Sequence, residues 1–197
     1  MSAAKELFLK RGFEKVTARE IAHAAGTTPA MIHYYFENKM GLFRAMLQDA
    51  IDPFMRMLSG AVAADAEAEF DLGALIRGHL KTAAANSWLA SLIVHDVLPE
   101  DGQFRATFTR EIASRLLPML VQLIEHGRAS GRLRADIDPQ LTALSILSLN
   151  VFPLISRPIT QPILGFKLEG EGLDRLVAHT TRLLFDGIGP NPQGNSR

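Results

Sequence analysis

Apolar residues recur along almost the whole chain at intervals of three and four, which is the spacing of one face of an α-helix. No Asn-Gly or Asp-Gly turn lies between runs in which apolar and polar residues alternate, so the pattern gives no sign of a β-hairpin. The pattern therefore predicts an all-α fold, whose elements are set by the helix start and stop signals along the chain.

The first two predicted helices end at glycines. An apolar stripe that includes Ala4 ends at Gly12, a residue type common at helix C-termini. The sequence Thr17-Ala18-Arg19-Glu20 is a capping-box pattern, in which the threonine hydroxyl and the glutamate carboxylate each bond a free backbone N–H. A second helix is therefore expected from Ala18 to a tight turn at Gly26.

A short third helix and a longer fourth helix follow. Thr28 and Pro29 suit the N-cap and the first helical position, and the apolar spacing continues the third helix to Phe36. Asn38 is expected to cap the fourth helix, in which Pro53 is expected to introduce a kink. These N-terminal helices are expected to form one small domain.

An alanine-rich, acidic stretch at residues 61–71 separates these helices from a second helical block. Helical patterns follow in five segments, at Leu72–Asn86, Trp88–Leu98, Gln103–Ala129, Pro139 to about Ile155, and about Gly172 to Gly187. We therefore expect one domain at residues 1–50, a second at 51–188, and a disordered tail at 189–197.

Composition places the chain among folded proteins. Hydrophobic residues make up 47% and charged residues 21%, which is far from the composition of disordered chains. The cysteine count of 0 excludes disulfides, thiolate metal sites and cysteine nucleophiles. The first ten residues lack the apolar stretch of an export signal, so the expected location is the cytoplasm.

The distribution of charge fits a protein with a few placed cations. The formal net charge is +0, which argues against coating nucleic acid by bulk electrostatics. Residues 1–50 hold seven of the 21 cations and five of the 21 anions, a net of +2, so the remainder carries 14 minus 16, or −2. Many proteins that do not bind DNA show as much asymmetry, so charge alone does not decide.

The segment Pro139–Ser156 raises the question of a membrane span, because it has no charged residue over 18 positions. We expect no membrane association, since the segment holds several polar residues and two prolines, and basic anchors flank neither end. A helix that is apolar almost all round is more often buried in a core or against a partner subunit.

The second and third helices fit a helix-turn-helix. Small Ala22 allows the two helices to cross closely, Gly26 makes the turn, and Ile32 faces the core. The segment Pro29–Phe36 could then lie in a DNA major groove, with aromatic hydroxyls and an imidazole beside Lys39 facing phosphates. The alternative is that both tyrosines are core-edge aromatics of an unrelated helical domain.

The residues Thr17 to Ala22, Gly26 to Ala30, Tyr34 to Lys39 and Leu42-Phe43 resemble the tetracycline-repressor (TetR) family over about residues 3–50. The resemblance implies that Arg19 and Thr28 to Ala30 approach bases, whereas Thr17, His33, Tyr35 and Lys39 hold phosphates. The whole set of expected DNA contacts is Thr17, Arg19, Thr28, Pro29, Ala30, His33, Tyr34, Tyr35 and Lys39.

Two departures from the family pattern affect this expectation. His33 replaces a common tyrosine, although a neutral imidazole can still donate a hydrogen bond to a phosphate. Family members usually have a further turn of the first helix and often a basic arm. We therefore expect either a start upstream of Met1 or the loss of some phosphate contacts.

The resemblance also implies a C-terminal helical domain that binds a ligand and forms a homodimer through its last two major helices. The expected dimer contacts are Leu144, Leu147, Val151, Leu173, Leu176, Val177 and Leu184. A small, largely apolar effector is expected, since such sites are mostly apolar with a few orienting polar groups. The candidate ligand-binding residues are His79, Trp88, His95, Phe104, Phe108, Asn150 and Phe152, with plain core packing as the alternative for each.

The expected function is a regulator, most simply a repressor, that binds a near-palindromic DNA operator as a homodimer and is released by its effector. The helix from Asn38 to about Leu58 is the expected link between the two domains. An enzyme is disfavoured, because no GxSxG, HExxH, P-loop or GxGxxG motif occurs. No metal or other cofactor is expected, since no histidine pair has the spacing of a helical metal motif. A helix-turn-helix scaffold without an effector is the remaining alternative.

Overall fold

The computed structural model describes residues 1–63, 71–165 and 167–188, in which every regular element is a helix. The all-α prediction is therefore confirmed. These residues divide into two compact units, Met1–Pro53 and Phe54–Arg197. The expected disordered tail lies outside the described residues, as does most of the stretch expected to separate the domains.

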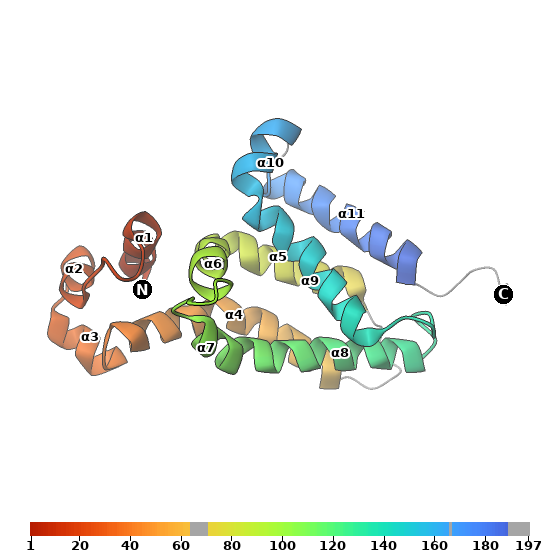
Figure 1. The fold of residues 1–197 in the computed structure, drawn as a ribbon, viewed down its shortest axis with the longest axis horizontal. Helices are drawn as coiled ribbons and strands as arrows, with labels where there is room; N and C mark the ends of the chain where they lie inside the picture. The colour runs from red at the N-terminus through yellow and green to blue at the C-terminus, as the bar shows by residue number, and fades with distance from the viewer. Residues whose placement is uncertain (64–70, 166, 189–197) are drawn as a thin grey trace. The chain divides into compact units, whose positions relative to one another are not determined.

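The first unit contains the predicted N-terminal helices, of which the fourth ends later than the expected Leu58. They are α1 (Ser2–Arg11), α2 (Ala18–Ala24), α3 (Pro29–Phe36) and α4 (Lys39–Ala63), the last of which continues into the second unit (Figure 1). Gly12 follows α1 with φ 78°, a backbone conformation that glycine adopts without strain. Pro53 lies inside α4, as expected.

Three aromatic rings hold the core of the first unit together. Phe13 lies between the other two, with its ring centroid 5.1 Å from that of Phe8 and 5.3 Å from that of Phe43. Phe13 and Phe43 are buried, together with Val16 and Met46. Tilted and edge-on aromatic pairs of this kind fix α1 and its C-terminal loop against the start of α4.

The second unit begins with the end of α4 and continues with shorter and longer helices (Figure 1). Its remaining α-helices are α5 (Leu72–Ala85), α6 (Trp88–Leu92), α7 (Arg105–Phe108), α8 (Ser114–Ala129), α9 (Pro139–Ile155), α10 (Arg157–Leu164) and α11 (Gly170–Ile188). Two π-helical segments, η1 (Ile93–Val97) and η2 (Thr109–Ala113), extend α6 and join α7 to α8.

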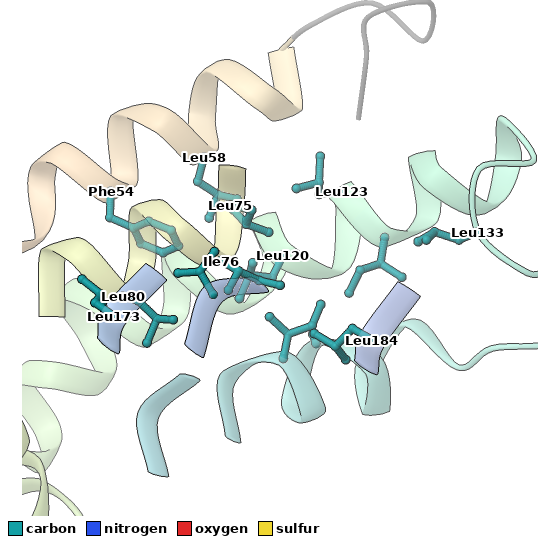
Figure 2. Close-up of a cluster of buried hydrophobic side chains, with 14 residues drawn as sticks. Phe54, Leu58, Leu75, Ile76, Leu80, Leu120, Leu123, Leu133, Leu173 and Leu184 are labelled. Carbon is teal, nitrogen blue, oxygen red and sulfur yellow. The ribbon is translucent and has the colours of Figure 1, made fainter. Parts of the chain in front are cut away.

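Leucine and isoleucine side chains from five helices form the core of the second unit (Figure 2). Helix α5 packs against both α9 and α11, and α8 packs against α9. The buried residues include Leu58 of α4, Ile76 and Leu80 of α5, Leu120 of α8 and Leu184 of α11. This interdigitated core positions the polar side chains discussed below.

The structure departs from the predicted elements in four places, the first of which is η1, a π-helical segment within the helix predicted at Trp88–Leu98. The predicted helix at 103–129 is interrupted by η2, and α10 was not predicted, because its two prolines masked the helical pattern. Thr28 is the N-cap residue of α3, but its side chain makes no capping hydrogen bond.

No single helix of the described segments has both the length and the apolar character of a membrane span. The segment with no charged residue corresponds to α9. It reaches the length and apolar character of a membrane span only when α10 is counted with it, and the two helices meet at a bend of 76°.

Candidate DNA-binding surface and ligand-binding interior

The predicted capping box at the start of α2 is present. Glu20 N donates to Thr17 Oγ1 at 3.2 Å, and Thr17 N donates to Glu20 Oε2 at 2.7 Å. Arg11 adds an ion pair, with 2.7 Å between its Nη1 and Glu20 Oε1. Because the Thr17 N–H and the Arg11 guanidinium bond this carboxylate, the pKa of Glu20 is lowered to about 2. The start of α2 therefore stays intact well below neutral pH.

This network limits what Thr17 can offer to DNA. Its hydroxyl donates to Glu20 Oε2 at 2.8 Å and its N–H donates to the same oxygen. A hydroxyl has only one hydrogen to donate. Thr17 is exposed, but a phosphate contact from it would have to replace one of its bonds to Glu20.

Helices α2 and α3 pack closely through small and branched residues. Ile21, Ala22 and Ile32 are buried, and Thr27 N donates to the Ala22 carbonyl oxygen at 2.9 Å across the turn. Gly26 supplies the turn with φ 65°. The packing predicted for a helix-turn-helix is therefore present within the first unit.

One face of α3 points to solvent. Tyr34 is 79% exposed and Tyr35 is 65% exposed, and their rings meet edge-on with centroids 5.0 Å apart. Pro29, Ala30 and His33 are exposed as well, and so are Arg19 and Thr28. The interpretation of both tyrosines as core-edge aromatics is therefore wrong. Met31 is also exposed on this helix.

Lys39 is held by the loop after α1. Its Nζ donates to the Phe13 carbonyl oxygen at 2.9 Å and lies 4.1 Å from the centroid of the Phe13 ring. An ammonium group has three N–H donors, so two remain for a phosphate. Lys39 therefore contributes to the fold of this unit in addition to any contact with DNA, a role that spacing in the sequence did not reveal.

The junction between α3 and α4 is tight and strained. Glu37 has φ 64° and ψ −45°, and Asn38 N donates to the Phe36 carbonyl oxygen at 2.7 Å, as in a γ-turn. Asn38 Oδ1 accepts from Gly41 N at 2.9 Å, which confirms Asn38 as the cap of α4. A Cβ on Gly41 would lie 1.8 Å from the Phe36 carbonyl oxygen, so only glycine fits without movement.

The structure sorts the candidate ligand-binding residues by burial. Trp88, Phe104 and Asn150 are buried, His79 and Phe108 are partly buried, and His95 is exposed. Phe152 is 65% exposed, so its expected place in a cavity of the protomer is wrong. The reason is helical spacing, since Phe152 lies two residues after buried Asn150 and therefore on another side of α9.

Among these candidates, His79 has a lowered pKa. It lies beside Phe54, with ring centroids 5.0 Å apart, and burial lowers its pKa to about 4. His79 is therefore neutral at pH 7. Among the described residues, no group of three or more His, Asp or Glu side chains is placed to hold a metal ion.

The expected dimer residues fall into two groups. Leu144 is 59% exposed, and Leu147, Val151 and Leu176 are partly buried. The other three, Leu173, Val177 and Leu184, are buried in the core of their own unit. Their assignment to a dimer surface is therefore wrong, because the stripe of α11 formed by these three faces α5 rather than solvent.

Exposed apolar side chains lie on α9, α10 and α11, and of these only Leu144 belongs to the expected dimer set. They are Leu141, Leu144, Phe152, Ile159, Ile163, Leu164, Leu183 and Phe185. The residues on α10 were missed because no helix was predicted there. The spacing of Ile159 and Ile163, four apart, was the available signal.

Sequence profiles of two protein families match the chain. Residues 1–46 match the family described as bacterial regulatory proteins, tetR family. Residues 70–184 match the tetracyclin repressor-like C-terminal domain. The second match covers the greater part of the second unit.

The chain is similar in sequence to characterised bacterial regulators. It is 24% identical to the transcriptional repressor KstR2 of Rhodococcus jostii over 141 residues, which is 72% of this chain and 69% of that protein. It is 26% identical to the transcriptional regulator RutR of Escherichia coli O157:H7 over 191 residues, which is 96% of this chain and 89% of that protein.

Solved structures of regulators share the fold. The fatty acid degradation regulator FadR of Bacillus halodurans superposes with a TM-score of 0.73 at 22% identity, covering 94% of this chain and 92% of that one. FadR of Bacillus subtilis in complex with stearoyl-CoA gives 0.71 at 20% identity, covering 95% and 96%. A complex of SmeT, a repressor from Stenotrophomonas maltophilia, with triclosan gives 0.73 at 16% identity, covering 96% and 90%.

Proposed function

This chain belongs to the TetR family of bacterial regulatory proteins, and on that premise we propose that it is a cytoplasmic, ligand-responsive repressor that binds a near-palindromic operator as a homodimer. The sequence relatives are transcriptional regulators rather than enzymes, which supports this class of function. The exposed face of α3 is the observation that carries the proposal, because a soluble unit of this size rarely leaves two adjacent tyrosines unpacked.

Helix α3 is the proposed recognition helix. Its first turn, with Pro29 and Ala30, enters the major groove beside Thr28, and Arg19 of α2 reaches base edges. His33, Tyr34 and Tyr35 contact the groove wall and phosphates, and the two remaining N–H groups of Lys39 bind a phosphate. Thr17 is the weakest member of this set, because Glu20 already bonds both of its donors.

A DNA-binding titration tests this proposal. The purified protein is titrated against labelled fragments from around its own gene, at several salt concentrations, by fluorescence anisotropy. Lys39→Ala should weaken binding to every fragment and reduce the slope of log affinity against log salt by about one, because one phosphate contact is lost. Tyr35→Ala should weaken binding while the slope stays nearly constant.

Lys81→Ala is the matched control, since Lys81 is an exposed cation on α5 outside the first unit. It should leave both affinity and slope unchanged. Because Lys39 also holds the Phe13 loop, the thermal unfolding of the Lys39 variant must be measured in parallel. A wild-type protein that ignores every fragment at low salt, or a Lys39 variant with the wild-type slope, would remove this surface from the DNA interface.

The proposed dimer uses the exposed apolar residues of α9 and α11, with Leu144 and Leu183 as its centre and partly buried Leu147, Val151 and Leu176 at its edge. Burying such side chains against a second copy removes apolar surface from water. Two copies related by a twofold axis would present two recognition helices to the two halves of a palindrome.

The proposed effector site lies in the interior of the second unit, where Trp88, Phe104 and Asn150 are buried and His79 and Phe108 line the margin. Structures of similar fold with triclosan and with stearoyl-CoA support a ligand-binding role for this unit. Release from DNA requires an effector that binds the non-binding conformation more tightly than the DNA-binding one. His95, which is exposed, has no place in this interior.

A further inference from the structure

Among the buried polar atoms of the second unit that lack a hydrogen-bond partner within the described residues, two lie on the core-facing stripes of α5 and α9. They are Oδ1 of Asn150 and Nδ1 of His79. The side chain of Asn150 is almost wholly enclosed, since the residue is 1% exposed. Buried polar atoms are nearly always bonded, and leaving one without a partner destabilises the folded state. The two atoms therefore call for a partner that the described residues do not provide.

Both side chains extend the same apolar core. Asn150 follows Ile146 by four residues on the buried stripe of α9, and His79 follows Leu75 by four residues on that of α5. Ile146 and Leu75 belong to one cluster of buried side chains, and α5 packs against α9. Helix α6, which follows α5 in the chain and carries buried Trp88, also packs against α9.

The chemistry of the two atoms restricts the partner. An amide oxygen only accepts hydrogen bonds, so Asn150 Oδ1 requires a donor. A neutral imidazole nitrogen donates or accepts according to its tautomer, and burial keeps His79 neutral at pH 7 by lowering its pKa to about 4. The buried polar side chains of the described residues are Thr142, Asn150 and Thr180, none of them charged. An ionic group would find no counter-charge among these fully buried residues, since the partly buried charges Glu111 and Arg128 lie on η2 and in the last turn of α8.

We propose that Asn150 and His79 are the polar recognition groups of the effector site, and that the effector is an apolar molecule with an uncharged hydroxyl group. The hydroxyl donates to Asn150 Oδ1, and His79 Nδ1 bonds the same molecule. This inference rests on the proposed function and narrows it to one chemical class of effector. A site built to bond a hydroxyl discriminates strongly against analogues that lack one, because its polar atom then stays unpaired.

Matched probes test the chemical class. We would use 4-butylphenol and decan-1-ol as hydroxyl probes, 4-butylanisole as the analogue without a donor, decanoate as the anion and decylamine as the cation. Binding is followed by the fluorescence of Trp88, which is the only tryptophan of the chain, and by thermal shift. The hydroxyl probes should bind at least ten times more tightly than the other three and should lower the affinity for DNA.

Substitutions test the residues. Asn150→Leu removes the unpaired oxygen with little change in volume, so we expect the melting temperature without probe to rise by a few degrees. The same variant should bind 4-butylanisole as tightly as 4-butylphenol, because the group that distinguishes them is gone. His79→Leu should weaken binding of the hydroxyl probes at least threefold.

Thr181→Val is the matched control. Thr181 Oγ1 is also buried without a partner among the described residues, but its side chain lies beside Gly73 near the start of α5. This variant should also raise the melting temperature, yet it should keep the wild-type preference for 4-butylphenol. The control therefore separates removal of an unpaired atom from loss of ligand recognition.

Three results would overturn the inference. One is a wild-type protein that binds no hydroxyl probe or binds the charged probes equally well, and another is an Asn150→Leu variant that keeps the preference for 4-butylphenol. The third is a lower melting temperature for that variant, which would mean that Asn150 is bonded in the free protein. Operator binding by the wild type without probe is measured in the same series. If the wild type does not bind the operator, the proposed function is contradicted. If it binds the operator but gives any of the three results above, only this inference is contradicted.

Discussion

At the scale of single residues, the structure concentrates unusual chemistry in a few positions that the apolar pattern did not distinguish. His79 occupies a position of the buried stripe of α5 where leucine would satisfy the same spacing. Its sequence position made it a candidate, but only its contact with Phe54 and its unpaired Nδ1 show that it is held neutral in the interior. Such a residue links protonation to folding.

The pH dependence of unfolding should report this histidine. The pKa of His79 falls from an ordinary 6.5 to about 4 on folding, so between these values the unfolded chain takes up a proton that the folded chain excludes. Protonation of His79 in the unfolded chain therefore does not affect the free energy of unfolding well above pH 6.5. It lowers that free energy as the pH falls towards 4, by at most about 3 kcal/mol. In urea unfolding, the difference in free energy between the wild type and His79→Gln should therefore shift in favour of the variant as the pH falls from 7 to 4.5, because only the wild type carries this histidine. A constant difference between them would contradict the assignment.

Gly41 should be intolerant of substitution although it lies in a helix, where alanine is normally favoured. A Cβ at this position would meet the Phe36 carbonyl oxygen at 1.8 Å, so the end of α3 would have to move. We expect Gly41→Ala to lower the free energy of unfolding by about 2 kcal/mol and to weaken DNA binding.

Gly60 provides the matched control within the same helix, because no heavy atom lies within 4 Å of the position of its Cβ. Gly60→Ala should stabilise the protein by up to about 1 kcal/mol through helix propensity. Equal effects of the two alanines in thermal and urea unfolding would show that the junction between α3 and α4 is not tight.

At the scale of elements, local signals in the sequence placed most helices correctly. The capping box at Thr17 and the proline at the start of α9 are short-range chemistry, which a sequence displays directly. The π-helical turns and α10 were missed, since an extra residue in a helical turn and proline-containing helices depend on tertiary packing. Which stripe of α11 faces the core was also beyond the sequence, because that helix carries apolar residues on two sides.

The N-cap of α9 offers a quantitative test at this scale. Asp138 Oδ1 accepts from Gln140 N at 2.8 Å and from Leu141 N at 3.0 Å. Asp138→Ala leaves two N–H groups without this acceptor and should lower the free energy of unfolding by about 1 kcal/mol. Asp138→Ser, which retains an oxygen acceptor, should recover most of the loss in urea unfolding. No loss in the alanine variant would mean that water replaces the cap.

At the scale of the whole molecule, the exposed and buried leucines of the last helices should separate assembly from folding. Leu144 is exposed on α9, whereas Leu184 is buried in the core of its own unit. Leu144→Glu should leave a folded monomer with an unchanged helical circular dichroism spectrum and weak operator binding. Leu184→Ala should instead lower the free energy of unfolding by about 3 kcal/mol through a cavity.

Analytical ultracentrifugation and thermal unfolding of the two variants distinguish these roles. A Leu144→Glu protein that sediments as a dimer would place the interface elsewhere. The sequence alone shows that α9 and α11 carry more apolar residues than one buried stripe needs. It does not show which of these residues face the core and which are exposed, because that depends on how each helix is rotated against α5.

The two π-helical segments on either side of residues 98–108 bear on how the lengths of homologous chains vary. A π-helical turn holds one residue more than the α-helical turn it replaces, so it absorbs an insertion without rotating the helix beyond it. Homologues are therefore expected to differ in length by single-residue gaps at 93–97 and at 109–113. If an alignment allows no gap at those positions, the buried residues that follow are paired with the wrong residues of the homologue.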